Sequence, residues 1–258
     1  MAYWRKNTRK QRPRVCDPEA SPYAEFHDIG LSIGGRRILQ GLSLTLSEHR
    51  IGVIGLNGSG KSSFVRLLNG LRTPDAGSLT LFGAPGERAL PELPRHVGFV
   101  FQNPDHQAIF PTVEEEIAFG LTQLGADKTE SRARARDFLA RHGCGQLADS
   151  PVAELSGGQK QLICILAVLV MEPRLLVLDE PLTSLDALAT GRIRDKLLSL
   201  PQKIVMVSHD LGHLAGFDRI LWLEDGRLRM DGPPDTVLPA YSADIRRRLG
   251  TEAELAAL

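Results

Sequence analysis

Residues 55–62, with the sequence GLNGSGKS, follow the pattern G-x-x-x-x-G-K-[ST]. Glycines let a backbone curl so that several N–H groups point at one anion. The lysine of such a loop can reach the β- and γ-phosphates of a nucleotide, and the hydroxyl beside it can ligate Mg²⁺. The alternative is a glycine-rich turn with a chance lysine. The nucleotide contacts expected here are Gly55, Asn57, Gly58, Ser59, Gly60, Lys61, Ser62 and Ser63.

Two acidic residues, Asp179 and Glu180, directly follow the apolar residues 175–178. Such a run predicts a buried strand, and the ligands of a parallel sheet bind at the carboxyl ends of its strands. One acid there can hold Mg²⁺, and a second can orient a water for in-line attack on a phosphate. An ordinary strand-end turn is the alternative, but the phosphate loop favours the catalytic interpretation.

Gln102 and His209 also follow predicted buried strands, at residues 97–101 and 204–207. The amide of Gln102 can reach the shell of a magnesium ion, and the imidazole of His209 can donate a hydrogen bond to a γ-phosphate. Taken singly, each is more often an ordinary loop residue, and His209 with Asp210 could simply cap the next segment.

Residues 155–159, with the sequence LSGGQ, contain a second candidate anion site. Ser156 and Gln159 have the spacing of a capping box, which predicts the start of a helix. Gly157 and Gly158 each lower helix propensity by about 1 kcal/mol relative to alanine. They also expose backbone N–H groups at the positive end of the helix dipole. Two anion sites on different elements suggest that each nucleotide is held between two chains.

The wider pattern positions these residues on an α/β fold with a mostly parallel sheet. A strand at 51–54 precedes the phosphate loop, and a helix should begin at about Lys61. Short β patterns from residue 26 predict an antiparallel subdomain, and Asp225-Gly226 predicts a hairpin. Thr112 and Glu115 have the spacing of a capping box that opens a helical insertion. The predicted segments are a basic tail at 1–22, a main domain at 23–240 with a helical subdomain at 103–160, and a helical tail at 241–258.

The composition is that of an ordinary globular chain: 258 residues, 42% hydrophobic, 24% charged and with zero formal net charge. The neutral charge gives no indication of nucleic-acid binding. Cys16, Cys144 and Cys164 show no metal-ligand spacing and cannot all pair, which favours a reduced cytoplasmic setting. The longest apolar run, residues 162–171, is too short to span a bilayer. The first residues lack the apolar segment of a signal peptide.

The tail at 1–22 is crowded with arginine and lysine. A disordered tail is the favoured interpretation, and attraction to anionic lipid is the alternative. If the protein acts at a membrane, it must dock onto a partner that spans it.

The order and approximate spacing of these motifs resemble those of an ATPase subunit of ABC transporters. The motifs are the loop at 55–62, Gln102, the segments 155–159 and 175–180, Ser184-Leu185-Asp186, and His209. The resemblance covers about residues 24–240, and P-loop kinases and GTPases lack the LSGGQ segment. It implies ATP and Mg²⁺ as ligands, with Ser62, Gln102 and Asp179 around the metal. The catalytic residues that it implies are Glu180 as general base, His209 at the γ-phosphate, Lys61 and Gln102.

The resemblance also implies a head-to-tail dimer that closes on two ATP molecules and reopens on hydrolysis. Ser156 and Gly158 would contact the γ-phosphate of the ATP held by the opposite subunit, with Gly157 and Gln159 in the same segment. Asp186 would contact the other subunit as well. A homodimer and a heterodimer with a sister ATPase both fit, because both half-sites are complete in this chain.

A narrower likeness lies around the glutamine. Residues 100–107 and 111–120 resemble the ATPases of energy-coupling-factor importers of vitamins and metals, and residues 47–57 resemble most the biotin-importer ATPase. The cobalt or nickel importer ATPase is the near alternative. The likeness implies a small polytopic transmembrane coupling protein, a substrate-binding membrane subunit and a peripheral place at the cytoplasmic face of the membrane.

The sequence departs from the family pattern in two places. Family members often stack adenine on an aromatic residue near the position of Ile33, and Ser63 stands where threonine is frequent. A soluble ABC-type ATPase acting on DNA or ribosomes is the rival function. Such proteins usually carry a long coiled-coil insertion or two ATPase halves, and this sequence shows neither pattern.

Overall fold

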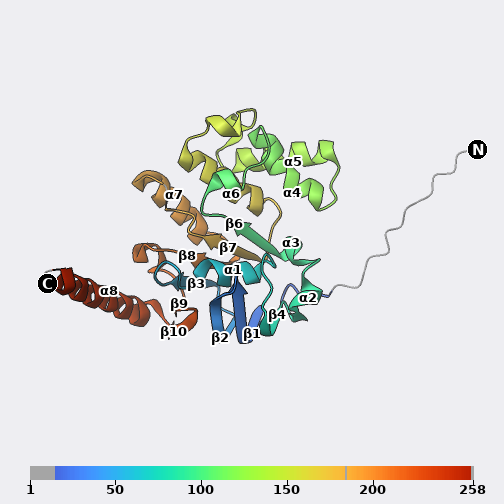
Figure 1. Cartoon of the computed structure of the whole chain (residues 1–258). Coiled ribbons are helices and arrows are strands. Elements are labelled where there is room, and N and C mark those ends of the chain that lie inside the picture. Colours follow the sequence, from blue (N-terminus) through green and yellow to red (C-terminus); the bar gives the residue numbers. More distant parts are fainter. Residues whose placement is uncertain (1–14, 184, 257–258) are drawn as a thin grey trace, which may run out of the picture.

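The computed structural model describes residues 15–183 and 185–256 (Figure 1). Its centre is a six-stranded sheet with the order β10-β9-β3-β8-β7-β6. Neighbouring strands from β9 to β6 run parallel, and β10 pairs antiparallel with β9, so the predicted α/β fold with a mostly parallel sheet is confirmed. The strands are β3 (Arg50–Ile54), β6 (Val97–Val100), β7 (Leu175–Asp179), β8 (Lys203–Val207), β9 (Arg219–Glu224) and β10 (Arg227–Gly232).

A four-stranded antiparallel sheet of order β2-β1-β4-β5 forms a second layer. Its strands are β1 (Ala24–Ile33), β2 (Arg36–Leu46), β4 (Ala76–Leu81) and β5 (Ala84–Pro85). Helix α1 (Lys61–Leu68) contacts both sheets, and its Phe64 ring lies 5.1 Å from the ring of Phe26 on β1. Because its apolar side chains are buried on both sides, α1 is fixed in place.

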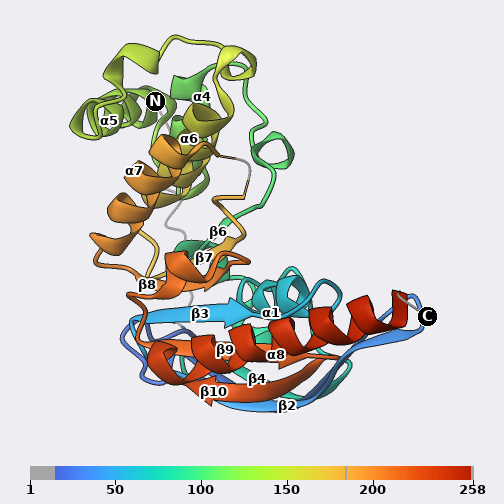
Figure 2. The same ribbon diagram turned by 90° about the vertical axis from the view of Figure 1, so that its left-hand side faces the viewer.

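The third part is a helical lobe on the opposite side of the central sheet (Figures 1 and 2). It contains α4 (Val113–Gln123) and α5 (Lys128–Arg141), which lie within the expected bounds 103–160, and α6 (Gly157–Leu169), which continues past residue 160. Thr112 caps α4 as expected, since its hydroxyl accepts from the N–H of Glu115. The Thr112 hydroxyl also donates to the Glu115 carboxylate at 3.0 Å. Because this carboxylate is bonded to the hydroxyl and not to the backbone N–H of Thr112, only half of the capping box is formed.

Four further helices connect or flank these layers. They are α2 (Gly86–Ala89), α3 (Leu93–His96), α7 (Ala187–Leu198) and α8 (Pro234–Ala256). Short 3₁₀ turns lie at Pro104–His106, Gly145–Leu147, Val152–Glu154 and Leu211–Leu214. No helix in the described part of the chain is long and apolar enough to cross a membrane.

The predicted C-terminal boundary lies within one continuous helix. Helix α8 starts at Pro234, before the expected start at residue 241, and runs alongside β9 and β10 (Figure 2). Tyr241 packs edge-on against Trp222 of β9, with ring centroids 5.1 Å apart. The segment from 241 onward therefore continues a helix that is packed on the main sheet.

The predicted basic tail at 1–22 extends too far along the chain, because its last part belongs to the folded domain. Residues 1–14 lie outside the described part, but Cys16 is only 3% exposed. The backbone N–H groups of Val15 and Cys16 donate to the carboxylate of Glu92 at 2.9 and 3.1 Å. The last part of the supposed tail is therefore bound to the domain.

The packing of the helical lobe on the sheet can be tested by a substitution at Gly98. A Cβ atom on Gly98 of β6 would overlap Val168 of α6 and lie 3.0 Å from Pro173. We expect Gly98→Ala to lower the free energy of unfolding by about 1–3 kcal/mol. Gly191→Ala on α7 is the control, because that position has open space and alanine favours a helix by up to about 1 kcal/mol. Denaturant unfolding measures both, and equal stability of Gly98→Ala and the parent would contradict this packing.

Candidate nucleotide site

The phosphate loop joins β3 to α1, and its three glycines, Gly55, Gly58 and Gly60, all have a positive φ that other residues rarely adopt. Gly55 has φ +148°, and a Cβ atom there would overlap the carbonyl oxygen of Leu223. Gly60 is the left-handed N-cap of α1, with φ +99°, and a Cβ atom would lie 3.0 Å from the carbonyl oxygen of Ile38. The loop therefore fits between β9 and β2 only with glycine at both positions.

Inside the loop, the polar groups fit an anion. Lys61 is 5% exposed, and its Nζ donates to the carbonyl oxygens of Gly55 at 2.8 Å and Leu56 at 3.0 Å. Burial lowers the pKa of Lys61, against the opposing effect of Glu180 and Asp179. Ser59 Oγ is buried without a hydrogen-bond partner in the described part of the chain. A bound phosphate would supply both a charge for the lysine and an acceptor for the hydroxyl.

Asp179 ends β7 next to the first turn of α1. Its Oδ1 accepts a hydrogen bond from Ser62 Oγ at 3.0 Å, and its Oδ2 lies 3.7 Å from Arg66. Burial raises the pKa of Asp179 although both neighbours oppose the shift. The hydroxyl, the carboxylate and the nearby amide of Gln102 are the oxygen donors that Mg²⁺ prefers, so the residues present fit this ion.

Glu180 contacts two of the other predicted catalytic residues, His209 and Gln102. Its Oε1 lies 2.7 Å from His209 Nε2, and its Oε2 accepts from Gln102 Nε2 at 3.0 Å. The three side chains follow β7, β8 and β6, which are neighbours in the central sheet. Glu180 is 8% exposed and has φ +54°, a strained conformation typical of functional turns.

These groups surround one cavity of about 650 Å³. It is lined by Ile38, Asn57, Gly58, Gly60, Lys61, Ser62, Ser63, Gln102, Glu180, Thr183 and His209. Gly58 has open space around it, which leaves room for a ligand against the backbone. Most of the predicted loop and strand-end residues thus line one cavity, whereas Gly55, Ser59 and Asp179 lie outside its lining.

Two residues of the lining were missed by sequence reasoning. Ile38 on β2, rather than Ile33, is the apolar residue that lines the cavity. Ile33 lies at the end of β1, where it pairs with Arg36 and is 36% exposed. Thr183 donates to the carbonyl oxygen of Glu180 at 3.2 Å, and its hydroxyl lies 3.4 Å from the Glu180 carboxylate. The position of the Thr183 hydroxyl, three residues after Glu180, was the sequence feature that could have identified it.

The LSGGQ segment lies outside the lining of this cavity. Ser156 and Gln159 form the complete capping box: the Ser156 N–H donates to Gln159 Oε1 at 2.9 Å, and the Gln159 N–H donates to Ser156 Oγ at 3.3 Å. A Cβ atom on Gly158 would lie 2.9 Å from Ala189 of α7. Asp186 caps α7 by accepting from the Ala189 N–H at 2.8 Å. The residues predicted to serve a second chain, Gly157 included, thus lie near the starts of α6 and α7.

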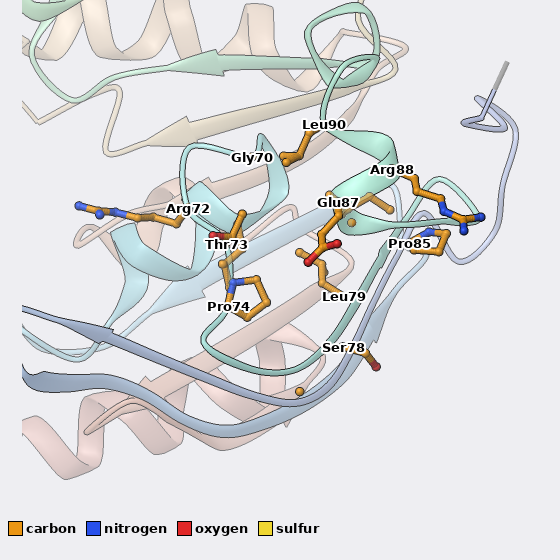
Figure 3. Close-up of a pocket in the computed structure, with 14 residues that line it drawn as sticks. Gly70, Arg72, Thr73, Pro74, Ser78, Leu79, Pro85, Glu87, Arg88 and Leu90 are labelled. Carbon is orange, nitrogen blue, oxygen red and sulfur yellow. The ribbon is translucent and has the colours of Figure 1, made fainter. Parts of the chain in front are cut away.

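A second cavity, of about 320 Å³, lies between the end of α1, β4 and α2 (Figure 3). Its lining includes the apolar side chains of Leu79 and Leu90 and the acidic residue Glu87. Figure 3 shows the guanidinium groups of Arg72 and Arg88 on opposite sides, directed away from each other. Because its charged groups do not converge, the cavity at the phosphate loop is the candidate site.

The chain matches the ABC transporter family over residues 39–183. It is similar to the "Biotin transport ATP-binding protein BioM" of Rhodobacter capsulatus, with 45% identity over 85% of this chain and 95% of that protein. The "Nickel import ATP-binding protein NikO" of the same organism is 39% identical, over 88% and 95% of the two chains. The "Energy-coupling factor transporter ATP-binding protein EcfA1" of Latilactobacillus sakei subsp. sakei is 35% identical, over 77% and 73%.

A solved structure supports the same conclusion. The protein cbiO1 from Clostridium perfringens, described as part of the ABC transporter complex cbiONQ, aligns with a TM-score of 0.74 and 27% identity, over 92% of this chain and 99% of that one. The chain therefore belongs to the ABC transporter family, as one of its ATP-hydrolysing ATP-binding proteins.

Proposed function

We propose that this ATPase dimerises on ATP and powers uptake of a vitamin or metal ion through a membrane-embedded importer of the energy-coupling-factor type. The observation that carries the proposal is the contact of Glu180 with both His209 and Gln102 beside a phosphate loop. The similarity to importer ATPases supports the direction of transport. Biotin is the favoured cargo because BioM is more similar than NikO, and nickel or cobalt is the alternative.

In the proposed reaction, water attacks the γ-phosphorus of ATP as the bond to the ADP oxygen breaks. Glu180 accepts a proton from this water, and His209 donates to a γ-phosphate oxygen. Lys61 and the loop N–H groups stabilise the phosphate charge. When Mg²⁺ is bound, held by Ser62 and Asp179 with Gln102 completing its shell, it supplies further neutralisation of the β- and γ-phosphates.

The case for a second chain comes from the start of α6. Ser156, Gly157 and Gln159 are exposed, and the N–H groups of Gly157 and Gly158, in the first helical turn, have no carbonyl partner within the helix itself. The helix dipole makes this end attractive to an anion, yet the segment does not line the chain's own cavity. We infer that it binds the γ-phosphate of ATP held by another ATPase, with Asp186 close to the same interface.

A patch of apolar side chains supports a membrane partner. Ile109 is 67% exposed and Phe119 is 37% exposed, and the Phe119 ring lies 4.8 Å from that of Phe110. The buried carboxylate of Glu116 accepts from the N–H groups of Ile109 and Phe110, both at 2.9 Å. The loop is thereby held with apolar side chains in solvent, so we infer that a transmembrane coupling protein covers it, next to a substrate-binding membrane subunit. The ATPase would then lie at the cytoplasmic face of the membrane as a peripheral subunit.

The base assignment is tested by Glu180→Gln. The amide cannot take a proton from water, so we expect hydrolysis to fall at least 100-fold, in line with general-base effects of about 10²–10⁴. ATP binding should persist, and the variant should accumulate as an ATP-bound dimer in size-exclusion chromatography with light scattering. Glu130→Gln, on the exposed face of α5, is the control. Hydrolysis by Glu180→Gln at the parental rate would show that Glu180 is not the base.

The role of Ser156 is tested by two substitutions that differ in charge but can both cap helix α6. Aspartate and asparagine cap helices about as well as serine, so both variants should keep α6. In the Glu180→Gln background, we expect Ser156→Asp to block ATP-driven dimerisation by repelling the incoming phosphate. Ser156→Asn should dimerise at lower ATP concentration than Ser156→Asp, while single-chain ATP binding stays unchanged in both. Equal dimerisation of Ser156→Asp and its parent would remove Ser156 from the interface.

The partner and the cargo are tested by one purification from detergent-solubilised membranes. We expect the tagged chain to recover a small polytopic protein and a second membrane subunit, and Ile109→Ser with Phe119→Ser to reduce recovery at least tenfold. Leu71→Ser, at a 54% exposed leucine elsewhere on the surface, is the matched control. Mass spectrometry of the complex then shows whether it carries biotin or a metal. Recovery of ribosomes or DNA instead would contradict the importer.

A further inference from the structure

Three side chains with different metal-ligating groups converge outside the ATP site. The Cys16 thiol, a carboxylate oxygen of Glu92 and a ring nitrogen of His96 all lie within 4.8 Å of one another. Cys16 belongs to the segment before β1, while Glu92 and His96 lie at the start and end of α3. The separation of 76 residues between Cys16 and Glu92 explains why cysteine spacing gave no sign of this cluster.

The geometry of α3 aligns two of the three ligands. Residues four apart lie on the same face of a helical turn, and His96 Nε2 is 3.9 Å from Glu92 Oε2. The imidazole ring also packs against the ring of Phe82, with centroids 5.4 Å apart, which limits its rotation. Both side chains are largely shielded, at 15% and 21% exposure, so they are constrained in place.

The third ligand is brought in by the backbone. The N–H groups of Val15 and Cys16 each donate to one oxygen of the Glu92 carboxylate. A carboxylate oxygen has two acceptor sites, so the same oxygen can accept a hydrogen bond and ligate an ion. Hydrogen bonds of this kind also orient a ligating carboxylate, as is usual around metal sites. The thiol of Cys16, a residue only 3% exposed, is thereby held against the pair on α3.

We propose that Cys16, Glu92 and His96 bind a zinc-class divalent ion. Sulfur, imidazole nitrogen and carboxylate oxygen are the donors of tetrahedral zinc sites, whereas thiolate disfavours Mg²⁺ and Ca²⁺. Metal–ligand bonds of about 2.0–2.3 Å place tetrahedral ligand atoms roughly 3.3–3.8 Å apart, so small side-chain rotations close the site. Three ligands come from the described residues, and water would supply the fourth.

Such an ion would tie the segment before β1 to α3. His96 directly precedes β6, whose far end leads to Gln102 in the ATP site. The ion would therefore fix the start of a strand that supports the catalytic cavity. This role is structural and separate from the magnesium expected there, because the two sites share no residue.

The test uses the full-length protein, reduced, free of nucleotide and stripped of metal by a chelator. On titration with Co²⁺, we expect one ion per chain and a thiolate-to-cobalt charge-transfer absorption, which Zn²⁺ then displaces. Cys16→Ser should lose the absorption, and His96→Gln should weaken cobalt binding at least tenfold. Cys144→Ser and Cys164→Ser, at the two other buried cysteines, should retain the absorption.

A thermal unfolding experiment provides the second readout. Zn²⁺ should raise the Tm of the parent and of Cys144→Ser but not that of Cys16→Ser. Absence of the cobalt absorption in the parent, or its persistence in Cys16→Ser, would overturn the site. These outcomes do not depend on ATP hydrolysis, so they stand apart from the proposed transport function.

Discussion

The close fit of the phosphate loop between two sheets is the constraint on which the rest of this structure depends. Gly55 touches the backbone of β9 and Gly60 approaches the backbone of β2, so the loop is enclosed by both layers. Beyond this loop, the apolar side chains of helix α1 are buried, with Phe64 packed on Phe26. A shift of one sheet against the other would therefore disturb the loop.

The catalytic side chains take their positions from the same arrangement. Residues 175–178 alternate between the core around α1 and the core below the helical lobe, which leaves β7 buried on both faces. Because β6, β7 and β8 are parallel neighbours, their ends place Gln102, Glu180 and His209 within hydrogen-bonding distance. The buried Glu180 carboxylate is satisfied by these contacts, and it lies next to the cavity where a phosphate would be.

The starts of α1 and α6, at which we propose that phosphate groups bind, belong to different parts of one chain. Helix α1 points its start into the chain's own cavity, whereas α6 presents Ser156 and its neighbours to solvent. Gln107 connects the two regions: its side chain accepts from the Phe101 N–H at 3.1 Å and donates to the Cys164 carbonyl oxygen of α6 at 2.8 Å. The segment that carries Gln102 is thereby tied to the helix that we propose serves the other subunit's ATP.

The sequence by itself determined the α/β class, the loop, the strand-end acids and the helix caps, because these depend on local spacing and backbone preference. Ser156 and Gln159 show this, since their capping box forms between residues three apart. Only the tertiary structure decided that Ile38 rather than Ile33 lines the cavity, because sheet register sets which side chain faces the loop. It also decided that Cys16 meets Glu92, because contacts between residues far apart in the chain depend on how whole layers pack.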